Sequence, residues 1–137
     1  MKKLFTVFFI IFFISSCSKL NIFGFGKEKS EYEKYKINEF IWKASYQLLS
    51  KYPNTRADIK DGIILTDWIS TKKNPSSRFR ITIYILGSDL YEENIKILTE
   101  KEIYKNGSWT RAITNQSFNT NLLKTIMYKA KNLDPEN

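Results

Sequence analysis

Residues 78–86 read RFRITIYIL, and their strict alternation restricts the fold more than any other feature of the sequence. One parity holds Phe79, Ile81, Ile83 and Ile85, while the other holds arginine, threonine and tyrosine. Successive side chains of a β-strand point to opposite faces of the sheet. The pattern therefore predicts a strand with one core face and one solvent face, which is typical of an antiparallel sheet covered on one side.

Two amphipathic helices are predicted on either side of this strand. In residues 37–53 apolar side chains recur at three- and four-residue spacing, with Asn38 as N-cap and Pro53 as a stop. A second apolar stripe runs through residues 117–133 and ends before Pro135. Both segments are long enough for a helix that lays one face on a sheet.

Further strands are predicted from β-branched and aromatic residues. Residues 62–70 read GIILTDWIS, and residues 94–104 place isoleucines on one parity. An Asn106-Gly107 pair then predicts a tight hairpin turn, with Trp109 on a short returning strand. The linker TKKNPSS, before the alternating strand, is predicted as a turn.

The predicted fold class is α+β, in the order helix, three- to four-stranded antiparallel sheet, C-terminal helix. Both helices are expected on one face of the sheet, in a helix-grip-like arrangement, so the other face would be partly open. Residues 37–134 form a single domain in this interpretation, and the chain of 137 residues suits one small domain.

The N-terminus has the layout of a signal peptide. Lys2 and Lys3 precede an apolar run that ends at Ile14, which is too short to span a bilayer, and two serines follow. The sequence Ile-Ser-Ser-Cys ending at Cys17 resembles the lipobox of bacterial lipoproteins. The resemblance implies cleavage after residue 16 and lipid on Cys17, which anchors the protein to a membrane. The alternative is an incidental thiol at the end of an apolar leader.

The lipobox resemblance also implies a location in the cell envelope. The residues after Cys17 are Ser18 and Lys19 rather than an aspartate that would resemble an inner-membrane retention signal. We therefore expect the periplasmic face of the outer membrane. Residues 17–36 are Gly-broken and then rich in charge, and they are predicted as a flexible tether.

The basic composition is interpreted as a solvated surface. The formal net charge is +8, and the leader holds two of the lysines. A basic surface suits nucleic acid, anionic lipid or an acidic polymer. Export argues against nucleic acid, and the lysines are scattered rather than gathered in one run.

The residue types argue against catalysis. The chain has no histidine and one cysteine, which the lipid would occupy, so Cys/His nucleophiles, histidine bases and zinc sites are excluded. No glycine-rich phosphate loop is present, and we expect no cofactor and no metal. The pairs Glu92-Glu93 and Glu100/Glu102 are typical of surface charge. We predict that the protein is not an enzyme.

Asp67 is unusual because aspartate is depleted within strands. If Ile64, Thr66 and Trp68 face the helices, Asp67 lies on the open face with Arg78 or Arg80 as its partner. With the opposite parity, Asp67 would point inward and need backbone donors. The partner-binding residues that we predict are Asp67, Arg78, Arg80 and Tyr84.

Three segments carry a family resemblance, namely NEFIWKAS at 38–45, GIILTDW at 62–68 and the alternating strand at 78–86. They resemble a group of small bacterial lipoproteins known as domain of unknown function 3576, over about residues 36–133. The Thr-Asp-Trp sequence followed by an arginine-rich strand is also similar to the helix-grip domains of the C lipoprotein in the outer-membrane β-barrel assembly machinery. Neither resemblance implies catalytic residues.

Two functions remain open at this level. The first is a lipid-anchored, non-catalytic module that binds an envelope protein, as an accessory to outer-membrane assembly. The alternative is a module that binds peptidoglycan, lipid or another anionic polymer in the envelope. A deep apolar cavity between the helices and the sheet would favour the second function, and a filled core beside a flat aromatic and basic surface would favour the first.

Overall fold

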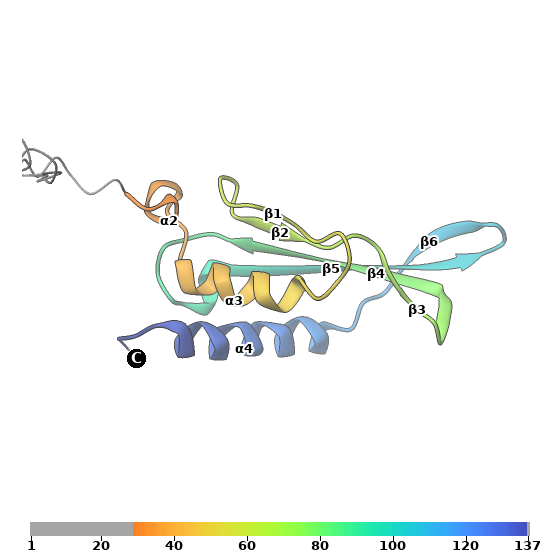
Figure 1. The fold of residues 1–137 in the computed structure, drawn as a ribbon. Coiled ribbons are helices and arrows are strands. Elements are labelled where there is room, and N and C mark those ends of the chain that lie inside the picture. Colours follow the sequence, from red (N-terminus) through yellow and green to blue (C-terminus); the bar gives the residue numbers. More distant parts are fainter. Residues whose placement is uncertain (1–28, 137) are drawn as a thin grey trace, which may run out of the picture.

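The computed structural model describes residues 29–136, so the predicted leader, Cys17 and most of the predicted tether lie outside the described residues (Figure 1). Helices precede and follow a run of strands, as the sequence predicts, with an α+β architecture. The elements are α2 (Glu31–Tyr35), α3 (Glu39–Leu49), β1 (Arg56–Asp58), β2 (Ile63–Leu65), β3 (Ile69–Thr71), β4 (Asn74–Ile85), the 3-10 turn η1 (Glu92–Asn94), β5 (Ile95–Lys105), β6 (Ser108–Ala112) and α4 (Gln116–Leu133).

The sheet is antiparallel and has six strands, more than the three or four predicted. Its order is β1-β2-β4-β5-β6, and β3 also pairs with β4. Because β5 takes one side of β4, the short strands β2 and β3 follow each other along the opposite side. Strand β1, which was not predicted, pairs with β2 at the edge.

Both predicted helices are confirmed, and their first turns show why they begin where they do. The Asn38 side chain accepts a hydrogen bond from the backbone N–H of Ile41 at 2.9 Å, so it caps α3 as expected. Asn115 caps α4 in the same way, accepting from the N–H of Ser117 at 2.9 Å. Helix α3 ends at Leu49, a few residues before the predicted stop at Pro53.

The core lies between the two helices and one face of the sheet. The alternation of residues 78–86 is confirmed, since Ile81, Ile83 and Ile85 are buried on the face that packs with the helices. Helix α3 contributes Ile41 and helix α4 contributes Ile126, both fully buried. Tight packing of such branched side chains fills this layer.

The predicted strand at residues 62–70 is wrong in one respect, because it is two strands with a break between them. Ile64 and Thr66 are buried on the helix face, as predicted, but Trp68 is not. The Thr66 N–H donates to the Ile81 carbonyl at 3.0 Å, but the Thr66 hydroxyl accepts from the N–H of Ile81 at 3.0 Å, where a continuous strand would use its backbone carbonyl. The chain leaves the ladder at Asp67, and Trp68 emerges on the opposite face, beside arginine side chains.

Of the two predicted turns, the one at Asn106-Gly107 is confirmed and the one before β4 is shorter than predicted. Asn106 and Gly107 both have positive φ, 51° and 83°, as the predicted tight turn requires. The turn predicted over the linker TKKNPSS is shorter in the structure, because β4 already begins at Asn74. Both hairpins, β3–β4 and β5–β6, extend past the ends of the helices (Figure 1).

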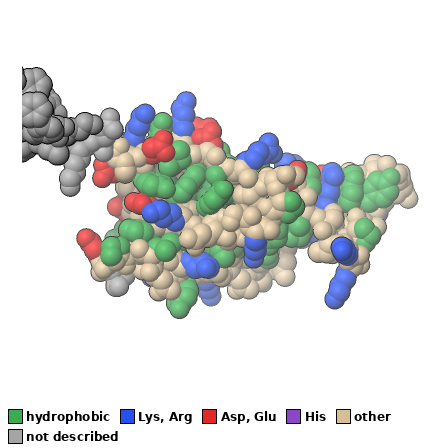
Figure 2. Space-filling model, viewed as in Figure 1, with side chains coloured by type: hydrophobic (Ala, Val, Ile, Leu, Met, Phe, Trp, Pro, Cys, Tyr) green, Lys and Arg blue, Asp and Glu red, His purple; other side chains and the backbone are tan. Residues whose placement is uncertain are grey.

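The surface differs between the two ends of the molecule. Figure 2 shows lysine, arginine and apolar side chains on the end formed by β3 and β6, and most of the acidic side chains visible in this view at the end near α2. Helix α2 lies within the range predicted as tether, and Tyr32 and Tyr35 pack against the core. Within residues 29–136, no helix combines the length and apolar character that a membrane span requires.

Candidate functional site

The open face of the sheet brings two of the predicted site residues together with two glutamates. In the β4–β5 ladder, Arg78 lies opposite Glu102 and Arg80 lies opposite Glu100. The Arg78 guanidinium pairs with Glu102 at 2.6 Å from Nη2 and 2.8 Å from Nε, and Arg80 pairs with Glu100. Arg111 of β6 approaches the other oxygen of Glu100 at 3.4 Å. These charges form a ladder across three strands.

Two tryptophans enclose Arg78 from either side. Its guanidinium carbon lies 4.6 Å from the ring centre of Trp68 and 4.2 Å from that of Trp109. Arg80 also lies over the Trp68 ring, at 4.9 Å. The face of an indole ring attracts a cation, so each contact fixes the arginine as well as the ring. Tyr104 extends this cluster, with its ring centre 5.3 Å from that of Trp109.

The positions of the two tryptophans follow from local structure. Trp109 lies opposite Tyr104 in the β5–β6 hairpin, whose register the Asn106-Gly107 turn sets. Trp68 reaches the open face because of the break after Thr66. We call the group formed by Trp68, Arg78, Arg80, Glu100, Glu102, Tyr104, Trp109 and Arg111 the open-face cluster.

The pair formed by Arg80 and Glu100 has shifted pKa values. The hydrogen bond from Arg80 holds the pKa of the Glu100 carboxyl below its ordinary value, and partial burial opposes this shift. The hydrogen bond to Glu100 likewise raises the pKa of Arg80. The cluster is therefore a set of compensated charges at neutral pH, with both carboxylates held by arginine.

The other two predicted site residues lie apart from the cluster's centre. Tyr84 is on the same face of β4 but lies opposite Ile63 and Lys96, farther along the strand. Asp67 is exposed, and its carboxylate accepts a hydrogen bond from the backbone N–H of Trp68 at 2.8 Å. The predicted ion pair between Asp67 and an arginine does not form, because the glutamates of β5 take both arginines.

Sequence reasoning missed the tryptophans and misread the glutamates as solvated surface charge. The signal for Glu100 and Glu102 was present, because they share a parity on a predicted strand. The register between β4 and β5 could not be predicted, because residues 86–94 contain no short turn motif that would fix it. The position of Trp68 depends on the break between β2 and β3, and the β-branched residues 62–70 predict one continuous strand instead.

The cluster presents aromatic and basic groups on the open face. Its carboxylates accept hydrogen bonds from arginine, and its exposed parts are aromatic rings and the guanidinium of Arg111, whose side chain is 86% exposed. In the part of the chain that the structure describes, no three His, Cys, Asp or Glu side chains are grouped to hold a metal ion.

Comparisons with known proteins identify relatives whose function is not described. The family model "Domain of unknown function (DUF3576)" matches residues 35–135. The chain is also similar to "Uncharacterized protein RP420" of Rickettsia prowazekii (strain Madrid E), with 29% identity over 115 residues that cover 82% of this chain and 69% of the relative.

The comparison with solved structures gives no significant match. The similarity to the C lipoprotein of the assembly machinery therefore stays a prediction. The family resemblance, in contrast, is confirmed, because the matched residues include both helices α3 and α4 and the whole sheet between them. The chain belongs to the DUF3576 family.

Proposed function

We propose that this protein is a lipid-anchored envelope lipoprotein that binds another envelope protein without catalysis, and that the open-face cluster is its contact surface. The observation that carries the proposal is the stacking of Arg78 between Trp68 and Trp109 on a sheet face that neither α3 nor α4 covers. Such a face presents ordered aromatic and basic groups to a partner.

The composition of the cluster supports a protein partner. Tryptophan, tyrosine and arginine are the residues that most often dominate the binding energy of protein interfaces. Both tryptophans are half-buried rather than buried, and Tyr104 is 47% exposed, so their rings keep free surface. Because their positions are held by strand pairing and ion pairs, little side-chain entropy would be lost on binding.

The packed centre of the layer between the helices and the sheet also fits a module whose protein contact lies on the open face. Ile41, Ile64, Ile81, Ile83 and Ile126 are fully buried between the helices and the sheet. This layer has the packing of a structural core, and it leaves the flat open face as the surface suited to a large partner.

The anchor in this proposal is Cys17, on the lipobox-like sequence at residues 14–17. Each buried methylene group of an acyl chain contributes about 0.8 kcal/mol to membrane binding, so several chains on one residue would give stable attachment. We propose the periplasmic face of the outer membrane as the site of attachment, and an accessory role in outer-membrane assembly as the context.

Site-specific photo-crosslinking in cells tests the contact surface. A photoreactive phenylalanine replaces Tyr104 on the open face or Tyr128 on α4, which is also an exposed tyrosine at 69%. We expect a discrete adduct with one envelope protein from position 104 and none from position 128. Equal adducts from both positions, or none from position 104, would contradict the proposal.

Removal of one charge then tests the chemistry of the contact. Arg78, Arg80 and Arg111 all lie opposite glutamates or pair with one, so reversal at any of them would place like charges across the ladder, and the exposed Arg111 is changed to glutamine instead. We expect Arg111→Gln to reduce the adduct from position 104, whereas Lys124→Gln, an equal charge change on α4, leaves it unchanged. Cys17→Ser in the same cells reports whether the contact needs the membrane anchor.

A further inference from the structure

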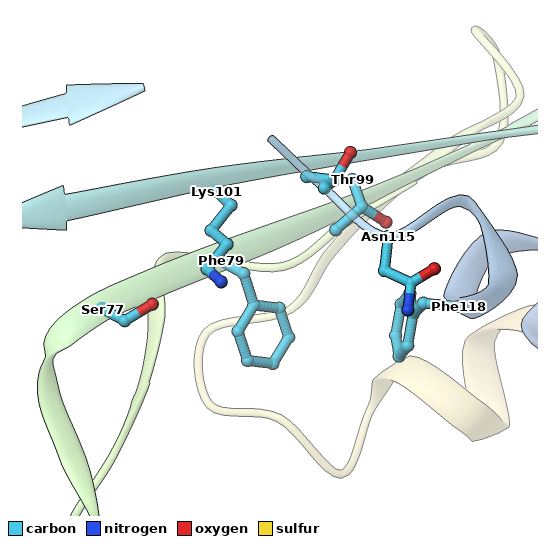
Figure 3. Close-up of a pocket in the computed structure, with 7 residues that line it drawn as sticks. Ser77, Phe79, Thr99, Lys101, Asn115 and Phe118 are labelled. Atoms are coloured by element: carbon cyan, nitrogen blue, oxygen red, sulfur yellow. The ribbon is translucent and has the colours of Figure 1, made fainter. Parts of the chain in front are cut away.

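A hollow on the opposite face of the sheet has a different chemistry from the open-face cluster. It lies where β4 and β5 pass the N-terminal end of α4, and its volume is about 280 Å³. Figure 3 shows the Phe79 and Phe118 rings on either side of the hollow, with Lys101 running beside Phe79. Its lining includes Ser77, Phe79, Thr99, Lys101, Asn115 and Phe118.

Lys101 is an unusual residue at this position. It shares the parity of Ile95 and Ile97 on β5, which is the parity that faces the helices, and it lies opposite Phe79 in the ladder. Its side chain is half-buried. The ion pairs among residues 29–136 leave Lys101 without a carboxylate, whereas the arginines on the open face are paired. A cation beside two aromatic rings would gain from an anion brought by a ligand.

Apolar side chains continue from Lys101 toward the helices. The Phe79 ring meets Tyr52 and Phe118 edge-on, with ring centres 6.4 Å apart in both pairs. Phe118 also lines a second hollow of about 230 Å³ in the crevice between α3 and α4. That hollow is lined by apolar side chains, including Leu48, Leu49, Tyr52 and Leu122, and by the polar side chains of Lys51, Asn121 and Thr125. Both hollows are lined by Phe118, and Lys101 lies in the first, whereas Lys51 in the second is exposed and lies over the Tyr52 ring.

We infer that this groove binds an anionic amphiphile, namely an unbranched acyl chain that carries one terminal carboxylate. The carboxylate pairs with Lys101, and the chain passes Phe79 and Phe118 into the crevice beside Leu122. Burying the chain against these side chains removes apolar surface from water. The inference does not depend on the open-face cluster, because the groove lies on the other face of the sheet.

The walls of the groove favour an acyl chain over a peptide. At Phe79 and Lys101 the strands pair with each other and with β3 and β6, so this part of the floor offers no free strand edge. A peptide lying on it would have to bury amide groups without partners, which costs free energy. An acyl chain has no such groups between its head and its end.

Photolabelling of the full-length protein in isolated membranes tests the inference. The probe is a twelve-carbon fatty acid with a photoreactive group in the chain and an alkyne tag at its end, and mass spectrometry maps the adducts. We expect adducts on the peptides that contain Phe118 and Leu122. Excess decanoate should compete with the probe, and decanol should not, because the alcohol lacks the charge that Lys101 binds.

Variants of the lysine separate a specific head-group contact from general attraction. We expect Lys101→Gln to lower the labelling about five- to tenfold, as loss of one charge-assisted contact implies. Lys101→Arg should retain the labelling. Lys105→Gln, the same change on an exposed residue of the same strand, should have no effect.

Three outcomes would overturn the inference. Adducts spread over the whole exposed surface would show that the probe labels by partition only. Equal labelling of Lys101→Gln and the unchanged protein would remove the role of the cation. Stronger competition by a peptide that ends in Leu-Phe with a free carboxylate would identify a peptide site in place of an acyl site. None of these outcomes bears on crosslinks from position 104, so the two proposals can fail separately.

Discussion

The two faces of the sheet are built from the same strands but are stabilised in different ways. On the helix face, Ile81 and Ile83 are buried against α3 and α4, and their contribution comes from the removal of apolar surface. On the open face, Arg78 and Arg80 alternate with them along β4, and their positions come from ion pairs and stacking on tryptophan. The stability of the helix face therefore depends little on pH and salt, whereas the arrangement of the open face depends on its charges.

This difference explains how one strand can serve both the fold and recognition. The packed layer on the helix face has no free surface for a partner. On the open face, Trp68 and Trp109 stay half-exposed beside the ion-paired charges. Charged pairs near the surface contribute little to stability, typically about 0.2 to 1 kcal/mol each. The open face can therefore change with less effect on folding than the helix face.

The largest expected difference between the faces is between two tryptophans. Trp42 on α3 is 9% exposed and belongs to the core, so Trp42→Ala should lower the free energy of unfolding by about 3 to 5 kcal/mol. Trp68→Ala removes two cation–π contacts on the open face and should cost about 1 to 2 kcal/mol. Urea titration of both variants measures the difference, and equal losses would mean that the open face is as well packed as the core.

The comparison also shows how far the sequence predicts the fold. The period-two pattern of β4 and the capped helices gave the α+β class and the buried parity, because burial of one face acts on every residue of a strand. The strand number was too low because the three-residue β1 is too short for a periodic signal, and because β2 and β3 were predicted as one continuous strand.

The candidate site was predicted in part, for reasons that concern tertiary structure. Arg78 and Arg80 were assigned to the open face from parity alone, and the structure places them there. Of the two parities left open for residues 62–70, the one that turns Ile64, Thr66 and Trp68 toward the helices holds for Ile64 and Thr66 but not for Trp68. The Thr66 N–H still donates to the Ile81 carbonyl, but the Thr66 hydroxyl accepts from the Ile81 N–H in place of the Thr66 carbonyl, and the strand does not continue beyond this point. The pairing of each arginine with a glutamate needed the β4–β5 register, which the sequence does not contain.

A conservative change on each face should give a smaller difference of the same sign. Ile83 is fully buried, and Ile83→Val should cost about 0.5 to 1.5 kcal/mol through loss of one methylene group. Ile63 lies on the open-face parity of β2, opposite Tyr84, and is half-buried. Ile63→Val deletes the same group and should cost less than about half as much, since water already reaches this face. Thermal unfolding of the two variants side by side measures the ratio, and a larger loss at position 63 would contradict the assignment of faces.

The smallest effect is expected at Glu100, where it should depend on pH. Arg80 lowers the pKa of this carboxyl in the folded state, so the pair stabilises the protein above the ordinary carboxyl pKa of 4.5, and the stabilisation is lost as the pH falls through the lowered pKa. Glu100→Gln should therefore cost about 0.2 to 1 kcal/mol at pH 7, and the cost should shrink toward acid pH and at high salt. Glu93→Gln, at an exposed glutamate outside the ion pairs of residues 29–136, serves as the control and should show neither dependence. Urea titrations of the three proteins from pH 7 to pH 3 measure the effect. A cost at Glu100 that stays constant over this range would mean that the carboxylate acts through packing, and the contrast between a charge-held face and a packed face would not hold at this residue.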